Sequence, residues 1–159
     1  MERILKLLEN DCRLTNKEIA TMLSLTENEV ARARDEYEKN GVILGYKACI
    51  DWDKTEDESV VAMIELKVTP QYGEGFDKIA KRIYQYPEVE TVYLMSGAFD
   101  LMVLIRGRTM KEVAMFVSTK LAPMEAVIST STSFMLKKYK ESGVIYDVKP
   151  GDEREVMLL

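Results

Sequence analysis

The chain has 159 residues, 47% of them hydrophobic and 31% charged, which suits a globular protein of one ordinary domain or two small ones. Its net charge of −5 argues against non-specific DNA binding over the whole surface, because DNA is a polyanion. Histidine is absent, so the commonest general base and metal ligand are missing, and we expect no catalytic site, metal or cofactor.

The sequence also bears on the compartment. The first ten residues, MERILKLLEN, carry charges within their apolar stretch, unlike a signal peptide. No apolar run approaches the roughly 18–20 residues of a membrane span. Cys12 and Cys49 are too few and too far apart for a disulfide framework or a metal clip. We therefore expect a cytoplasmic protein.

Two capping boxes divide the first fifty residues into three helices. Residues 2–9 show the apolar spacing of one helical face. In 15–18 (TNKE) and 26–29 (TENE), a threonine stands three residues before a glutamate, so each caps the other's backbone N–H. Gly41 suits the position after the third helix. The positions expected to face inward are Ile4, Leu5, Leu8, Ile19, Ala20, Leu23, Val30 and Tyr37. The pattern predicts a helix-turn-helix, winged-helix-like domain over residues 1–47.

A helix-turn-helix places its last helix in the major groove, although a small helical bundle without a DNA role fits the same pattern. Residues 1–47 hold eight basic and nine acidic side chains, so any DNA contact must be local. The candidates facing the groove are Asn28, Arg32 and Arg34, and those for phosphates are Lys17 and Lys47. All five are alternatively solvated surface residues, and Arg34 could extend from an inner position.

Residues 42–50 (VILGYKACI) are rich in apolar and β-branched side chains, which predicts a strand leaving the third helix. The polar, acidic run 51–59 then indicates a linker, so 48–59 is assigned as strand end and linker. Trp52 within it is expected to anchor packing rather than to stack on a ligand.

Residues 60–140 predict a second domain with the order βαββαβ, a ferredoxin-like α+β fold with both helices on one face of a four-stranded antiparallel sheet. The expected elements are a strand at 60–68, a helix burying 76, 79, 80 and 83, a hairpin of 89–96 and 99–106, a helix capped by 109–112 and a strand at 128–137. The second helix is expected to bury Met110, Val113, Phe116, Val117 and Leu121.

The strand 101–106 (LMVLIR) is apolar on both faces. Leu101, Val103 and Ile105 point one way, and Met102 and Leu104 point the other way. Because two helices can cover only one face, a second copy of the chain is the simplest cover for the other. The pattern therefore predicts a homodimer.

Three segments together carry a family resemblance. They are the helix-turn-helix with its exit Gly41-Val42-Ile43-x-Gly45-Tyr46, the hairpin Gly97-x-Phe99-Asp100-Leu101, and Val127-x-x-Thr130-x-Thr132 in the final strand. In this order and spacing the chain resembles the leucine-responsive regulatory protein / asparagine-regulator (Lrp/AsnC) family from Ile4 to about Lys140. The resemblance implies a transcription regulator that binds double-stranded DNA at promoters and senses amino acids or related effectors. It also implies a dimer that often assembles into octamers.

The resemblance also implies an effector site at Ser96, Gly97, Asp100, Thr130 and Thr132. A carboxylate suits an α-ammonium group, and hydroxyls with free backbone amides suit an α-carboxylate. The alternative is that Asp100 caps its turn and that the threonines are ordinary strand residues.

The chain departs from the family at several positions. Ala33 stands where the family usually has arginine, and Arg34 where it usually has an apolar residue. Glu27 and Glu29 bring negative charge to the start of the third helix, which repels phosphate, so we expect modest DNA affinity. Ser96, Phe99 and Ala126 also replace commoner residues, and the tail 141–159 lies beyond the common core, where its VIYDV stretch could add an edge strand.

Two other functions remain open at this point. The acidic start of the third helix would suit an amino-acid sensor that no longer binds DNA. Sirohaem decarboxylases resemble the same family, but an enzyme of that kind is expected to use histidine and basic residues around tetrapyrrole carboxylates. This chain has no histidine and an acidic second domain, which disfavours that activity.

Overall fold

The computed structural model describes residues 2–56, 58–70 and 75–146. The chain divides into two compact units, Met1–Ile50 (unit 1) and Asp51–Leu159 (unit 2), and each is described by itself. Among the described residues, no helix has both the length and the apolar character needed to cross a membrane.

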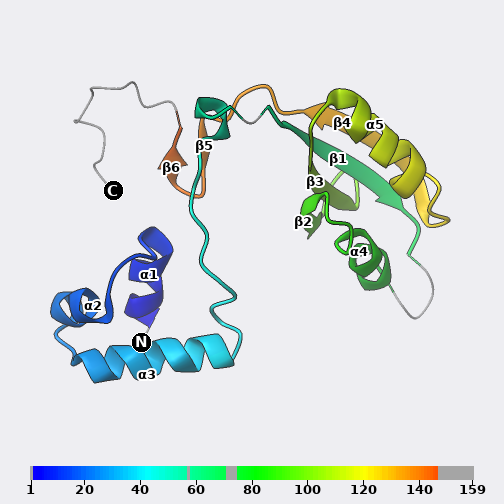
Figure 1. Cartoon of the computed structure of the whole chain (residues 1–159). Coiled ribbons are helices and arrows are strands. Elements are labelled where there is room, and N and C mark those ends of the chain that lie inside the picture. Colours follow the sequence, from blue (N-terminus) through cyan, green and yellow to red (C-terminus); the bar gives the residue numbers. More distant parts are fainter. Residues whose placement is uncertain (1, 57, 71–74, 147–159) are drawn as a thin grey trace. The chain divides into compact units, whose positions relative to one another are not determined.

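Unit 1 is a bundle of three helices: α1 (Glu2–Asn10), α2 (Asn16–Leu23) and α3 (Glu27–Lys39) (Figure 1). Both predicted capping boxes are confirmed, with Thr15 and Glu18 at the start of α2 and Thr26 and Glu29 at the start of α3. Ser24 closes α2 in the left-handed region at φ 56°, and Gly41 follows α3 at φ 68°. An N-cap such as Thr15 or Thr26 typically contributes about 1 kcal/mol.

The core of unit 1 is small and apolar. Its buried residues are Ile4, Leu8, Ile19, Ala20, Val30 and Ala33. Leu23 and Tyr37 pack on this core as predicted but are only half-buried, whereas Leu5 does not pack on it and Leu7 takes its place. The core thus sits where the three helices converge, which leaves the N-terminal half of α3 exposed on its other side.

The strand predicted over 42–50 is wrong: these residues, all of them described, form no regular secondary structure. The N–H groups of Val42 and Ile43 bond to the Tyr37 carbonyl, which keeps the chain against α3, and Ile43 packs on the core. A strand needs a neighbouring strand for its backbone hydrogen bonds, and the described part of the chain offers none here. The apolar composition of this segment therefore predicted a strand, but the segment has no neighbouring strand to pair with among the described residues.

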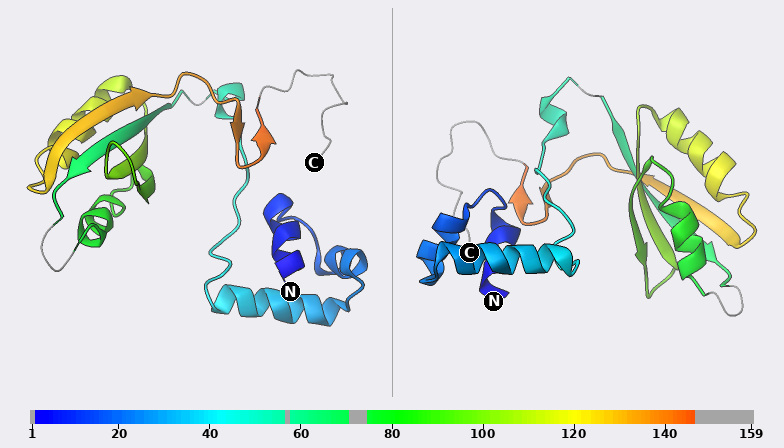
Figure 2. Two further views of the ribbon diagram at one scale, coloured as in Figure 1. Left: turned by 180° about the vertical axis from the view of Figure 1, so that it is seen from behind. Right: turned by 60° about the horizontal axis from the view of Figure 1, so that its bottom comes forward.

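Unit 2 has the predicted ferredoxin-like order, which is confirmed. Its elements are β1 (Val60–Val68), α4 (Asp77–Ile83), β2 (Val89–Leu94), β3 (Leu101–Gly107), α5 (Met110–Phe116), a π-helical turn η2 (Val117–Leu121) and β4 (Val127–Phe134). The antiparallel sheet has the order β2-β3-β1-β4. Both helices cover the same face of the sheet (Figure 2). The ends of the later strands differ from their predicted ends by one to three residues, as is common at frayed termini.

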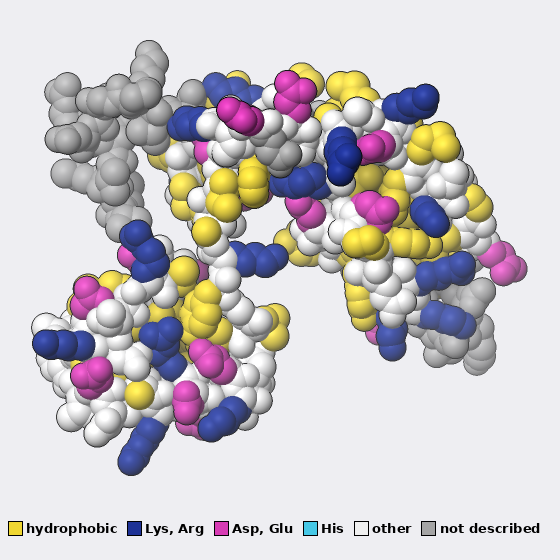
Figure 3. Space-filling model, viewed as in Figure 1, with side chains coloured by type: hydrophobic (Ala, Val, Ile, Leu, Met, Phe, Trp, Pro, Cys, Tyr) yellow, Lys and Arg dark blue, Asp and Glu magenta, His cyan; other side chains and the backbone are white. Residues whose placement is uncertain are grey.

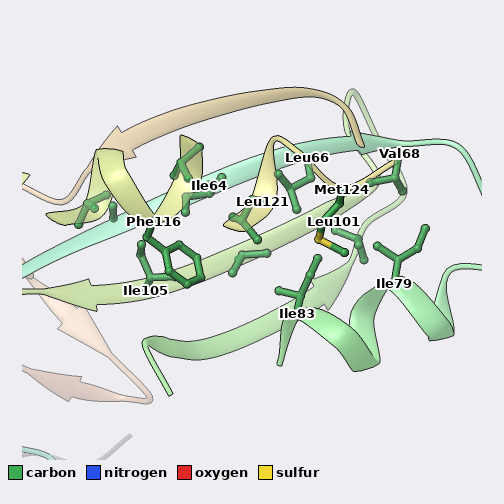
Figure 4. Packing of buried hydrophobic residues seen from close by; sticks show 14 residues of the cluster. Ile64, Leu66, Val68, Ile79, Ile83, Leu101, Ile105, Phe116, Leu121 and Met124 are labelled. Carbon is green, nitrogen blue, oxygen red and sulfur yellow. The ribbon is translucent and has the colours of Figure 1, made fainter. Parts of the chain in front are cut away.

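The main core fills the space between this sheet and its helices (Figure 4). Alternate residues of β1 and β3 point into it, such as Ile64, Leu66, Leu101 and Ile105. They meet Ile79 and Ile83 from α4 and Val113, Phe116 and Leu121 from the α5–η2 segment. Each such side chain contributes roughly 1.5–3 kcal/mol by leaving water.

Among the described residues of unit 2, no helix covers the opposite face of the sheet (Figure 2). Cross-strand pairing puts Met63, Met102, Leu104 and Tyr93 on this face, because each stands next to residues that point into the core. The side chains of Met63, Met102 and Leu104 are half-buried, and Tyr93 is 56% exposed. The two-sided apolar character predicted for β3 is therefore present.

Two expectations for α5 are wrong. Met110, expected to be buried, is 55% exposed, because it is the first helical residue and faces away from the sheet. The third capping box is only half formed: the Thr109 hydroxyl accepts from the N–H of Glu112, but the Glu112 carboxylate accepts from the N–H of Arg108 instead of Thr109.

In unit 2, the linker before the sheet and the tail after it each contain short secondary-structure elements. A single 3-10 turn, η1 (Trp52–Lys54), lies in the linker, and the Trp52 ring lies 5.9 Å from the Arg106 guanidinium carbon. Arg106 also binds Ser59 and Glu90. In the tail, β5 (Lys140–Glu141) and β6 (Val144–Ile145) form a hairpin of their own, so the expected edge strand does not join the main sheet. The remainder of the tail, 147–159, lies outside the described residues.

Candidate DNA-binding and effector sites

The exposed side of α3 carries two of the predicted groove-facing residues. Asn28 and Arg32 are four residues apart, lie on one helical face and are both exposed. Lys17, in the first turn of α2, and Lys47, beyond α3, are exposed as well. On the side of unit 1 seen in Figure 3, basic and acidic side chains are interspersed, so the basic residues do not merge into one continuous area.

Of the two glutamates at the start of α3, only Glu29 is bonded to the helix cap among the described residues. The backbone N–H and hydroxyl of Thr26 donate to the Glu29 carboxylate, and these bonds lower its pKa from the ordinary 4.5. The Glu29 carboxylate is therefore turned back onto the cap. Glu27 remains an exposed acid near the same helix end.

Arg34, the third groove-facing candidate, is half-buried and bonded within unit 1. Its Nη1 donates to the side chain of Asn16 at 2.9 Å and to the Leu14 carbonyl at 3.3 Å. Its Nη2 donates to the Tyr46 hydroxyl at 3.3 Å, and that hydroxyl donates to Glu38 at 2.9 Å. The sequence did not predict this network, although it offered two signals for it: an arginine that could extend from an inner position, and an aromatic residue with a polar tip after α3.

In unit 2, Asp100 lies where the β2–β3 loop, β1 and β3 meet. Its carboxylate Oδ2 accepts from the N–H of Val68 at 2.9 Å, next to a register shift between Lys67 and Val68. Its own N–H donates to Leu66, and its carbonyl accepts from the N–H of Met95. The carboxylate's other oxygen makes no hydrogen bond within the described part of the chain. Asp100 thus has both a structural contact and a free acceptor.

The loop between Met95 and Asp100 supplies possible donors. Ser96 and Gly97 are exposed, and the N–H groups of Gly97 and Ala98 make no backbone hydrogen bond within the described residues. A Cβ built on Gly97 meets nothing within 4 Å, and its φ is not left-handed, so this subunit itself does not require glycine there. Within the described ranges, no three His, Cys, Asp or Glu side chains form a potential metal site.

The two threonines lie on the far side of β1 from Asp100. Thr130 pairs with Leu66, which pairs with Leu101 on its other side, and Thr132 pairs with Ile64. Two strand spacings, roughly 10 Å, therefore separate Thr130 from the start of β3. The strand β1 therefore lies between the Asp100 carboxylate and the threonines of a single subunit.

Two family models match the chain along these units. The model described as "Winged helix-turn-helix DNA-binding" matches residues 2–43, which include all three helices of unit 1. The model described as "Lrp/AsnC ligand binding domain" matches residues 61–145, which include the whole sheet and both of its helices. The second match alone spans more than half of the chain.

Known proteins resemble the chain over nearly its full length. It is 48% identical over 155 residues to the HTH-type transcriptional regulator YugG of Bacillus subtilis, covering 97% of this chain and 93% of that protein. It is 29% identical to the HTH-type transcriptional regulator FL11 of Pyrococcus horikoshii, covering 89% and 90%.

Solved structures share the fold. One is the transcriptional regulator NMB0573 of Neisseria meningitidis in complex with L-Met, with a TM-score of 0.70, 23% identity and coverage of 87% and 88%. Another is AsnC of E. coli, with a TM-score of 0.66, 14% identity and coverage of 87% and 91%. With an N-terminal helix-turn-helix, a C-terminal ligand-binding domain and relatives of this kind, the chain belongs to the Lrp/AsnC family of transcriptional regulators.

Proposed function

We propose that this protein is a cytoplasmic regulator that binds specific double-stranded DNA through unit 1 and changes its DNA binding when unit 2 takes up an amino acid. The observation that carries the proposal is the pairing, in one chain, of a helix-turn-helix unit with a domain of the Lrp/AsnC ligand-binding type. We further propose that it works by binding alone and needs no cofactor.

In unit 1, Asn28 and Arg32 are proposed to meet base edges, since they share the exposed side of α3 near its N-terminal half. Amide and guanidinium groups are the side chains best matched to the edges of adenine and guanine. Lys17 and Lys47 are proposed as phosphate contacts, being exposed cations outside α3. Few such contacts in a chain of net charge −5 imply modest affinity, and each phosphate contact adds about 0.9 to the slope of log K against log salt.

In unit 2, the free oxygen of Asp100 is proposed to bind the ammonium group of an amino acid. The N–H groups of Gly97 and Ala98, with the Ser96 hydroxyl, would then bind its carboxylate. The L-Met found with the Neisseria regulator supports an amino acid as the class of effector.

Thr130 and Thr132 are proposed to complete this site from a second copy of the chain that meets the edge strand β4, because β1 separates them from Asp100 in their own subunit and because they share the core-facing side of the sheet with Leu66 and Ile64. The open face of the sheet, with Met63, Met102, Leu104 and Tyr93, is proposed as the surface that pairs two copies into a homodimer. Further association to an octamer would place additional loops against one another.

The test begins with selection of fragments of host genomic DNA by the purified full-length protein. Fluorescence anisotropy then measures the affinity for a selected fragment with and without each of the twenty amino acids, and calorimetry measures direct binding. We expect one fragment class to be bound and one or a few amino acids to alter its affinity. Binding of no fragment above random DNA would contradict the proposal for unit 1, and binding of no amino acid would contradict it for unit 2.

One alternative has an observation of its own. Glu27 and Glu29 bring two carboxylates to the start of α3, which favours an amino-acid sensor without DNA binding. The same experiment separates the two functions, because the sensor would bind an amino acid while selecting no DNA.

A further inference from the structure

The Arg34 network joins three parts of unit 1 that the helix-turn-helix core does not connect. From the middle of α3, the guanidinium reaches Leu14 and Asn16 at the start of α2. On its other side it reaches the hydroxyl of Tyr46, twelve residues further along the chain. Glu38, one helical turn beyond Arg34, accepts from the same hydroxyl, so the phenol is held between a cation and an anion.

The segment after α3 depends on this contact for its attachment. Val42 and Ile43 are held by the Tyr37 carbonyl, but residues 44–50, which are all described, donate no backbone hydrogen bond to any described residue. Leu44, next to Ile43, is 93% exposed. Beyond Ile43, the Tyr46 side chain is therefore the point at which the described chain is fastened to α3, and Lys47 follows it directly.

We propose that Arg34 is a positioning residue for DNA binding, which fixes Tyr46 against α3 and so holds Lys47 where it can contact a phosphate. This rests on the proposed DNA-binding function and assigns Arg34 a role in place of a direct groove contact. The planar guanidinium suits this role, because its donors point in several fixed directions and can bridge Asn16 and Tyr46 at once, whereas a lysine ammonium on a single flexible stem is less suited to both.

The decisive variant is Tyr46→Phe, which removes the hydroxyl and leaves the net charge unchanged. If Lys47 loses its position, the affinity for a selected fragment should fall roughly 3- to 10-fold, as for one net hydrogen bond. The slope of log K against log salt should also shrink by at least about half of the 0.9 that one phosphate contact contributes. A neutral substitution can lower that slope only by moving a charged residue.

Three further variants complete the experiment. Tyr37→Phe is the matched control, because the Tyr37 hydroxyl makes no hydrogen bond with a described residue, and it should leave both the affinity and the slope unchanged. Lys47→Gln should remove the effect of Tyr46→Phe when the two are combined. Arg34→Gln should weaken binding, and the double variant Arg34→Gln/Tyr46→Phe should be no weaker than the stronger single variant.

Two results would overturn the proposal. A wild-type affinity and salt slope in both Tyr46→Phe and Tyr46→Leu, the second of which also removes the ring that lies 5.5 Å from the Arg34 guanidinium carbon, would show that Tyr46 does not position Lys47. Additive effects of Arg34→Gln and Tyr46→Phe, with a further loss of about 0.9 in the slope, would show that Arg34 itself contacts DNA.

A measurement without DNA separates this proposal from the proposed function. The ¹⁵N heteronuclear NOE of the Lys47 amide should fall in both Arg34→Gln and Tyr46→Phe and stay at the wild-type value in Tyr37→Phe. An unchanged NOE would overturn the ordering role of Arg34 even if DNA binding is found. If the wild-type protein selects no DNA, the proposed function fails, while the NOE still decides whether Arg34 orders the segment.

Discussion

The two units hold their functional residues in place by different means. Among its described residues, unit 1 has six in its buried core, and its helix ends and exit segment depend on polar side chains such as Thr15, Thr26 and Arg34. The described part of unit 2 has fourteen buried core residues between a four-stranded sheet and two helices. A small core removes less apolar surface from water. Single polar contacts should therefore matter more to the structure of unit 1 than to that of unit 2.

The largest expected difference comes from matched core deletions. Ile19→Ala in unit 1 and Ile105→Ala in unit 2 each remove a side chain that is at most 1% exposed, at a cost of about 2–5 kcal/mol. We expect Ile19→Ala to unfold unit 1 at 25 °C and Ile105→Ala only to lower the melting temperature of unit 2. NMR spectra of the full chain, with well-dispersed sheet resonances as the internal control, distinguish the two. An equal loss of structure in the two variants would contradict the claim that unit 1 is less stable than unit 2.

At Asp100, two variants separate its structural contact from its proposed effector contact. Asp100→Ala leaves the Val68 N–H without its acceptor and should destabilise unit 2 by about 1–3 kcal/mol. Asp100→Asn retains an oxygen for that N–H and should be nearly as stable as the wild type, yet it should lose the amino-acid response with the charge. Thermal melts and calorimetry check both statements. An Asn variant that binds the amino acid with wild-type affinity would place the ammonium site elsewhere.

Substitutions at the helix caps of the two units should have a smaller effect on the free energy of unfolding. Thr26 forms a complete capping box, whereas Thr109 forms only its own half. Thr26→Ala should lower the free energy of unfolding of unit 1 by about 1 kcal/mol. Thr109→Ala should have a smaller effect on unit 2, and chemical denaturation of each variant measures the difference. A larger effect at Thr109 would mean that the reciprocal half of the box contributes nothing.

The smallest expected effect is on pH dependence. The cap bonds lower the pKa values of Glu18 and Glu29 from the ordinary 4.5. Their contribution to stability is therefore fully present above about that value and disappears as the pH falls through the lower folded-state pKa. The melting temperature of unit 1 should therefore fall as the pH is lowered through this range. The double variant Glu18→Gln/Glu29→Gln should show a smaller fall. An unchanged profile in the double variant would assign the acid sensitivity to other carboxylates.

The features that could be predicted from the sequence are those encoded by neighbouring residues. The capping boxes at 15–18 and 26–29 and the alternation in 101–106 gave correct helix starts and a correct buried face. The exit segment 42–50 was predicted wrongly, because a strand depends on a partner that local composition does not supply.

The site contacts were harder to predict because they join residues that are distant in sequence. The Val68–Asp100 bond spans 32 positions, and the Arg34–Tyr46 bond spans 12. The sequence did indicate Asp100 as a site candidate and offered turn capping as the alternative; the structure shows a cap together with an unbonded oxygen. The separation of Thr130 from Asp100 became visible only once the strand order placed β1 between them.

The central claim is that DNA is bound by unit 1 and the amino acid by unit 2, through separable residues. Anisotropy titrations of one selected fragment, with and without the amino acid found by calorimetry, test this directly on Arg32→Ala and Asp100→Asn. We predict that Arg32→Ala weakens DNA binding by about 1–3 kcal/mol and leaves the amino-acid affinity unchanged. Asp100→Asn should keep the wild-type affinity for bare DNA and lose the amino-acid response. Unchanged DNA affinity in Arg32→Ala, together with an intact response in Asp100→Asn, would contradict the account.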